Sequence, residues 1–331
     1  MRSRLGVGVV ALLTVATVSA QAQAPRRPVP SGSFGEQVTV LHLEPGITVT
    51  LVAPAHVDPR QPLDLILYAL PNGNTTAQTI GRRLDEGMDW HYDIQHIGAQ
   101  VRMLRTMGRP QAVVAYLEAR GLSWPAWRRG LGYDSANARI VRAVDEVRAA
   151  AGNPSRQRVT LAGHSGGGSL MFGFIEGATR LPAWLDRIVF LDANYNFEPS
   201  HAAPLAGWLA GDPGRELVAL AYDDRNIMLN GKKVVSDSGG TWRASERMLR
   251  ALGGHITFVT DTVGEFVRHR APQVQLLMHP NPENRILHTE MIGEMNGFAH
   301  AMLVGRPDYD RLPPLLRRER AYTRWVDTVA V

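Results

Sequence analysis

The chain has 331 residues, no cysteine and a formal net charge of +5. The lack of cysteine excludes disulfides, a thiol nucleophile, a lipid-anchored lipoprotein and a cysteine-based zinc site. Arginine carries nearly all the positive charge and is scattered among acidic residues, so the composition indicates no nucleic-acid-binding patch.

The N-terminus has the pattern of a secretory signal peptide. A basic start is followed by an apolar run over residues 5–18 and then by alternating small residues. We predict a signal peptide over residues 1–24, although cleavage after Ala20 or Ala22 would also fit. The apolar run is too short to span a membrane, and no later segment is long and apolar enough. The protein is therefore expected to be exported, to the periplasm or the medium.

Residues 25–35 are rich in Pro, Arg, Ser and Gly and are expected to be a flexible lead-in, and residues 36–331 have the length of a single catalytic domain. Strands are predicted at 37–43 and 47–52 as a hairpin, then at 63–70, 111–117, 159–162, 187–191, 216–222 and 274–278. Helices are predicted at 94–107 and 138–151.

Strands that alternate with helices predict an α/β fold, with a mostly parallel sheet covered by helices on both faces. The segment from 192 to 215 has the length of an ordinary connection and leaves no room for a large cap domain. Two longer segments, 71–98 and 225–245, are expected to rim the edge of the sheet where ligands bind. The second contains an Asn230-Gly231 hairpin signal.

The most informative segment is Gly163-His164-Ser165-Gly166-Gly167, which joins a predicted strand to an apolar helical pattern. A serine at such a turn takes a strained backbone conformation that only small neighbours allow. The following helix aims its N-terminal N–H groups at the place where an oxyanion would form. A simple glycine-rich turn is the alternative, and a phosphate-binding P-loop does not fit because no lysine follows the glycines.

This strand–turn–helix resembles the nucleophile elbow, G-x-S-x-G, of the α/β-hydrolase superfamily. The resemblance implies an α/β-hydrolase fold in which Ser165 is the nucleophile. It also implies that an acid and then a histidine follow in chain order.

For the acid, the family's spacing after a strand favours Asp224, which lies three residues after Ala221 and three before Ile227. Asp223 is the near alternative. Asp192 is the third candidate, because some hydrolases place the acid at the end of the preceding strand. Each of them could instead be an ordinary loop or capping carboxylate.

For the base, three histidines follow the last predicted strand. His279 stands at the strand end, and His300 lies in an apolar helical pattern, where packing is the expected role. His288 ends the intervening loop, where the superfamily carries its base, and it is the predicted choice. His164 inside the elbow is expected to point away and pack.

The oxyanion hole is expected to use the N–H groups of Gly166 and Asn74. Many relatives carry His-Gly-x after the earlier strand, whereas this chain has Asn72-Gly73-Asn74, so Asn74 could also belong to a plain turn. Trp90, His91 and Tyr195 are candidate substrate-binding residues, with simple packing as the alternative reading.

The sequence therefore predicts an exported serine hydrolase that cleaves carboxylic esters through an acyl-enzyme. The alternatives are an exported peptidase or amidase and a non-catalytic binding protein on the same fold. No cofactor or metal is expected, and the expected partner is a small or polymer-borne ester. The identity of that ester and the oligomeric state do not follow from the sequence.

Overall fold

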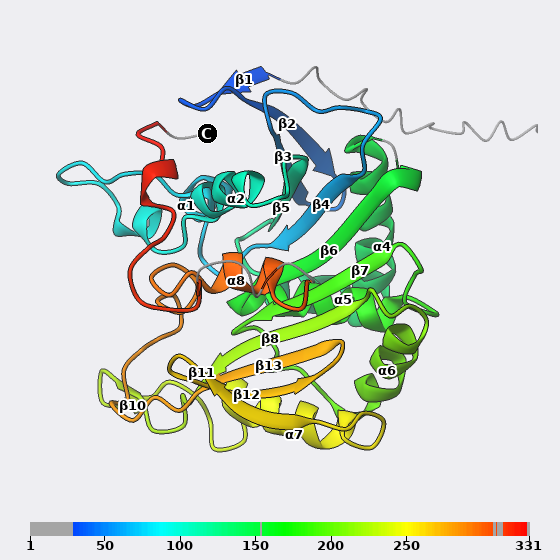
Figure 1. The fold of residues 1–331 in the computed structure, drawn as a ribbon, viewed down its shortest axis with the longest axis vertical. Coiled ribbons are helices and arrows are strands. Elements are labelled where there is room, and N and C mark those ends of the chain that lie inside the picture. Colours follow the sequence, from blue (N-terminus) through cyan, green and yellow to red (C-terminus); the bar gives the residue numbers. More distant parts are fainter. Residues whose placement is uncertain (1–28, 153, 307–308, 310–313, 330–331) are drawn as a thin grey trace, which may run out of the picture.

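The computed structural model describes residues 29–152, 154–306, 309 and 314–329; the predicted signal peptide lies outside these ranges. An 11-stranded sheet runs through the molecule in the order β1-β2-β3-β5-β4-β6-β7-β8-β13-β12-β11 (Figure 1). Its strands are β1 Val29–Ser31, β2 Glu36–Leu43, β3 Ile47–Ala53, β4 Leu63–Ala69, β5 Ala112–Ala119, β6 Gln157–His164, β7 Leu185–Leu191, β8 Glu216–Tyr222, β11 Val259–Val263, β12 Phe266–Ala271 and β13 Val274–His279.

The middle of the sheet is parallel, from β5 through β4, β6, β7 and β8 to β13, and both edges are antiparallel. The side chains of β4 explain the arrangement: the strand is buried along its whole length. Leu65 and Leu67 pack into the core on one face, and Ile66 and Tyr68 into the core on the other. A strand that is apolar on both faces needs helices on both sides, as parallel sheets have.

The helices form two layers. The layer over the Leu65 face contains α3 Trp124–Leu131, α4 Tyr133–Ala150, α5 Gly168–Gly177, α6 Ala202–Ala210 and α7 Thr241–Leu252. The layer over the Ile66 face contains α1 Thr76–Ile80, α2 Ile97–Thr106 and α8 Gly297–Leu303 (Figure 1). The α/β class and the mostly parallel central sheet predicted from the sequence are thus confirmed.

Some elements differ from the prediction. Residues 29–31 form β1, which pairs with β2, so this part of the expected flexible lead-in is ordered as a strand. Three helices, α1, α3 and α7, and the β11–β12 hairpin were not predicted. The Asn-Gly turn does form a small hairpin, β9 Met228–Leu229 with β10 Lys232–Lys233.

The carboxyl ends of the parallel strands meet at one edge of the sheet, and the loops that carry Ser165, Asp192, Asp224 and His288 all start there. The connection from β7 to β8 holds only η4, Pro199–His201, and α6, as its length predicted. This edge is therefore not roofed by an insertion at that point. In the described ranges no helix has the length and apolar character needed to cross a membrane.

Candidate active site

Ser165 stands at a sharp turn between β6 and α5. Its φ of 52° lies in the left-handed region, which costs a non-glycine residue on the order of 1–3 kcal/mol. Strain of this kind persists only where the surrounding structure enforces it. Here β6 is buried along nearly its whole length and α5 is buried on most of its faces, so both ends of the turn are fixed.

The glycines after Ser165 allow very close packing. A Cβ atom on Gly166 would lie 2.1 Å from the side-chain oxygen of Asn72, and one on Gly168 would lie 1.8 Å from the carbonyl oxygen of Ala193. Any side chain at either position would push the elbow away from the loops after β4 and β7. The glycines therefore hold Ser165 against the segment that contains Asp192.

His288 is paired with Asp192. Its Nδ1 lies 2.5 Å from Oδ2 of Asp192, and its side chain is 30% exposed, whereas that of Asp192 is buried. Asp192 has a φ of 47° directly after β7, and its second carboxylate oxygen accepts a hydrogen bond from the hydroxyl of Thr241. This arrangement fixes the ring orientation of His288 and leaves Nε2 as the nitrogen that can exchange a proton.

Asp224, the acid favoured by the sequence, does not contact His288. It is buried and accepts a hydrogen bond from the backbone N–H of Thr241 at 3.0 Å, and its Oδ1 has no partner among the described residues. Burial, and then the charge of Asp192, raise the pKa of Asp224 to about 6. Asp223, the second alternative, pairs with Arg225. In the structure the partner of His288 is thus Asp192, the third candidate, and not Asp224; the catalytic role of either acid stays a prediction.

His164 does more than pack. It is buried, and its Nε2 donates to the carbonyl oxygen of His288 at 3.0 Å, with the two rings 4.5 Å apart. Burial, followed by the neighbouring His288, holds the pKa of His164 well below its usual range, so the ring stays neutral. His164, the residue before Ser165, thereby holds the loop that carries the candidate base, a role that no sequence pattern indicated.

The other two candidates for the base, His279 and His300, contact different side chains. His279 lies 2.9 Å from Glu265 through Nε2. His300 is fully buried in α8 and contacts the hydroxyl of Tyr309, and burial lowers its pKa to about 3. His300 therefore packs in the helix, as its sequence context predicted.

A pocket of about 240 Å³ opens beside Ser165. Tyr195 lines it and is in hydrogen-bonding contact with the Ser165 side chain. Desolvation, then the charge of Asp192, raise the pKa of Tyr195 well above its usual range, so its hydroxyl stays protonated and can donate. The remaining lining residues are Asn72, Pro125, Arg129, Tyr133, Gly166, Ser169 and Asn196.

Of the two predicted oxyanion-hole residues, only Gly166 lines this pocket. From the Asn72-Gly73-Asn74 segment it is Asn72 that lines it, while Asn74 is buried and its side-chain nitrogen has no partner within the described part of the chain. The N–H of Gly73 donates a hydrogen bond to the carbonyl oxygen of Leu122. The role of Asn74 stays a prediction.

Trp90 and His91 lie outside the pocket at Ser165. Trp90 is 61% exposed and stacks on His91 at 3.9 Å between ring centres. It lines a second cavity, of about 600 Å³, whose wall also includes Thr289, the residue after His288. Trp90 therefore borders this neighbouring cavity and not the pocket at Ser165, and the substrate-binding role of Trp90 and His91 stays a prediction.

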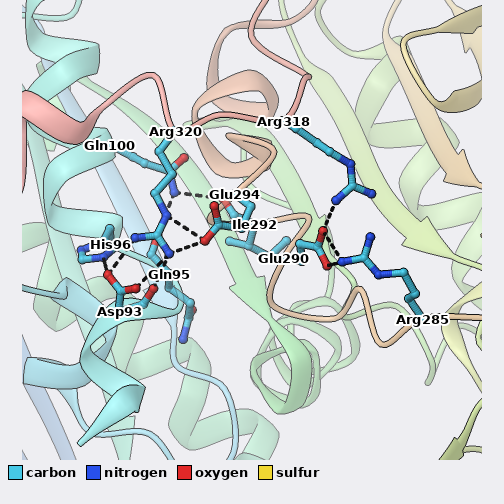
Figure 2. A network of polar contacts seen from close by, with 10 residues as sticks. All are labelled: Asp93, Gln95, His96, Gln100, Arg285, Glu290, Ile292, Glu294, Arg318 and Arg320. Carbon is cyan, nitrogen blue, oxygen red and sulfur yellow. Dashed lines mark hydrogen bonds and ion pairs between the residues drawn. The ribbon is translucent and has the colours of Figure 1, made fainter. Parts of the chain in front are cut away.

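The second cavity is rich in charge, and its arginines are paired with carboxylates. Figure 2 shows Arg320 between Asp93 and Glu294, and Glu290 between Arg285 and Arg318. Each of the three arginines has at least one carboxylate partner. Among the described residues, the cavity wall thus offers no unpaired arginine.

No protein-family model matches this chain, and no curated protein matches it. Among solved structures, it is similar to a thermostable esterase, with 12% identity and a TM-score of 0.48 over 78% of this chain and 59% of that one. It is also similar to a glucuronoyl esterase from Solibacter usitatus, with 12% identity and a TM-score of 0.44 over 80% and 83%. A third is a feruloyl esterase module from Clostridium thermocellum solved with sinapinate, with 10% identity and a TM-score of 0.48 over 91% and 97%. None of these three TM-scores reaches 0.5, so the case for a function depends on the site's own geometry. In its strand order and its strand–Ser165–helix turn, the chain resembles the α/β-hydrolases.

Proposed function

We propose that this protein is an exported serine hydrolase that cleaves carboxylic esters through an acyl-enzyme, with Ser165, His288 and Asp192 as its triad. The observation that carries the proposal is the 2.5 Å contact between His288 and the buried Asp192, in loops that start at the same sheet edge as the strained Ser165. A serine hydroxyl needs a base to take its proton and a carboxylate to orient that base. The three residues follow in the chain order serine, acid, histidine.

In the first half of the reaction, Nε2 of His288 takes the proton of Ser165 as the hydroxyl oxygen attacks the ester carbonyl. The imidazolium that forms is stabilised by Asp192 through Nδ1–H. His288 then protonates the leaving alcohol. In the second half, a water molecule loses a proton to the same nitrogen, attacks the acyl-enzyme and releases the acid with Ser165 restored.

The tetrahedral intermediates carry a negative oxygen that needs donors. The N–H of Gly166 at the start of the helical turn is the first candidate, because Gly166 lines the pocket. Asn74, predicted from the sequence, is the second. The protonated hydroxyl of Tyr195, which contacts Ser165, is a further donor at the reacting atoms.

The test is a panel of short-chain 4-nitrophenyl esters and matched peptide anilides, assayed with wild type and Ser165→Ala. Ester turnover should exceed anilide turnover, and Ser165→Ala should lose roughly a million-fold in kcat, as loss of a triad nucleophile does. Preferred anilide cleavage would point to the peptidase alternative. Ester turnover in Ser165→Ala at a tenth of the wild-type rate would exclude the serine mechanism.

Export is proposed from the sequence pattern of residues 1–24. Expression of the full chain with a cell-fractionation assay tests it. The processed protein should be found outside the cytoplasm, with an N-terminus near Pro25.

A further inference from the structure

The pocket at Ser165 has an unusual charge distribution. Its wall includes one charged residue, Arg129, and otherwise neutral polar or aromatic residues such as Asn72, Tyr133 and Asn196. A volume of about 240 Å³ is small beside the ~300–1,000 Å³ of pockets that take drug-sized ligands. Any group that enters must therefore come close to both Ser165 and the wall that carries Arg129.

The side chain of Arg129 is exposed and makes no hydrogen bond or ion pair with any residue that the structure describes. The arginines of the neighbouring cavity differ, because Arg285, Arg318 and Arg320 are each paired with a carboxylate. The acid of the site, Asp192, is buried and already paired with His288 and Thr241. The guanidinium of Arg129 is thus available to a ligand.

The helix that presents Arg129 is firmly anchored. Trp124 and Trp127 of α3 are buried in the core. The preceding residue, Arg128, is buried and donates to Asn137, to Glu176 and to the backbone carbonyl of Ser169 on α5. Arg128 therefore ties α3 to the helix that follows the nucleophile, and Arg129 stands at a fixed place relative to Ser165.

We propose that Arg129 selects esters that carry an anionic group, a carboxylate above all, near the scissile bond. This inference rests on the proposed ester hydrolysis and names its substrate class. The planar guanidinium binds a carboxylate through two parallel hydrogen bonds, and such charge-assisted pairs are about twice as strong as neutral ones. A neutral ester would leave this donor to water and gain nothing from it.

The experiment compares isosteric ester pairs that differ only in charge. Monomethyl succinate and methyl succinamate place the charge, or its amide match, on the acyl side. O-acetylglycolate and O-acetylglycolamide place it on the alcohol side. The ratio of kcat/KM for the anionic ester to that for its amide match cancels most of the effects of size, and the two pairs show on which side the anion sits.

In wild type the anionic ester should be preferred in at least one pair, and the preference should weaken as salt is raised. Arg129→Gln should lower that ratio roughly ten- to a hundred-fold, in line with loss of a hydrogen bond to a charged group. Arg180→Gln is the matched control, since Arg180 is also an exposed arginine but lies beyond the C-terminal end of α5 and lines another cavity. The control should keep all four rates.

A wild type without preference in either pair, or equal ratios in wild type and Arg129→Gln, would overturn the proposal. A second readout separates it from the ester-hydrolase proposal. In the Ser165→Ala background, the anionic ester of the preferred pair should bind more tightly than its amide match, and Arg129→Gln should remove the difference. Wild type could fail to turn over any of the four esters. In that case, anionic esters that bind equally well with and without Arg129 would overturn the inference. Anionic esters that bind more tightly only when Arg129 is present would support the anion site and would contradict only the ester-hydrolase proposal.

Discussion

Replacing Asp224 with asparagine should distinguish the roles of the two buried carboxyl groups, Asp192 and Asp224. Asp224 and Asp192 both bond Thr241, the first through its backbone N–H and the second through its hydroxyl. Asparagine at 224 keeps a carbonyl oxygen for that N–H and removes the charge next to Asp192. If Asp192 is the acid that orients His288, Asp224→Asn should retain most ester turnover, whereas Asp192→Asn should lose roughly ten-thousand-fold in kcat.

The effect on stability follows from the pKa of Asp224, about 6 in the folded protein against about 3.9 when unfolded. Below pH 4 both states carry the proton, and the group contributes nothing to the pH dependence. Between pH 4 and 6 the unfolded chain loses the proton first, so stability falls as pH rises. A pKa difference of about two units corresponds to about 3 kcal/mol. The free energy of unfolding of the wild type falls by this amount by pH 7, whereas that of Asp224→Asn does not.

Urea unfolding of both proteins at several pH values between 4 and 8 measures this difference. The stability of Asp224→Asn relative to wild type should rise by about 3 kcal/mol over this range and then level off. Because only the change with pH is compared, the constant effect of the amide cancels. A difference that is flat with pH would refute the shifted pKa, and a ten-thousand-fold loss of turnover in Asp224→Asn alone would return the acid to Asp224.

Three further outcomes are expected. Tyr195→Phe should lower kcat on the order of a hundred-fold with little change in KM, as loss of one oxyanion donor does, and an unchanged kcat would show that the hydroxyl has no part in the transition state. His300→Ala should lower the free energy of unfolding by about 3 kcal/mol in urea titrations, because it empties a buried site, while folded protein keeps its turnover; loss of turnover without loss of stability would contradict this. Since only η4 and α6 connect β7 to β8, short-chain esters should be cleaved as monomers with no jump in rate at the critical micelle concentration, and a marked jump would reveal a lid.

The parallel strands could be predicted because their composition is simple. β4 and β8 are buried, apolar runs bounded by turn residues, and the pattern predicts them directly. The β11–β12 hairpin was missed because its strands lie at the sheet edge and carry charge. Asp261 pairs there with Arg268 and Arg270, so no apolar alternation marks the strands.

The choice between Asp192 and Asp224 shows where the sequence fails. Both residues follow parallel strands that end at the same edge, so local spacing permits either one. Both also bond Thr241, so what distinguishes them is contact with His288, 96 residues later than Asp192. Such contacts depend on how distant loops pack, and no local pattern encodes them.

Trp90 and His91 make the same point for the substrate wall. The aromatic and polar residues of that segment predict a surface for ligands, and they do line or border a cavity, but one beside the His288 loop. Arg129 carries no sequence signal at all. Arg128 and Arg129 point in different directions from α3. The side chain of Arg128 is therefore buried and hydrogen-bonded, whereas that of Arg129 lines the pocket.

Ser165 is the proposed nucleophile, and the site of covalent labelling by a fluorophosphonate tests that role most directly. The wild-type protein should take up a single adduct, found by mass spectrometry on the peptide that contains Ser165, and ester turnover should fall in proportion to labelling. Ser165→Ala should remain unlabelled while folded. An adduct on another residue that tracks the loss of turnover, or full turnover in protein whose Ser165 is modified, would contradict the account.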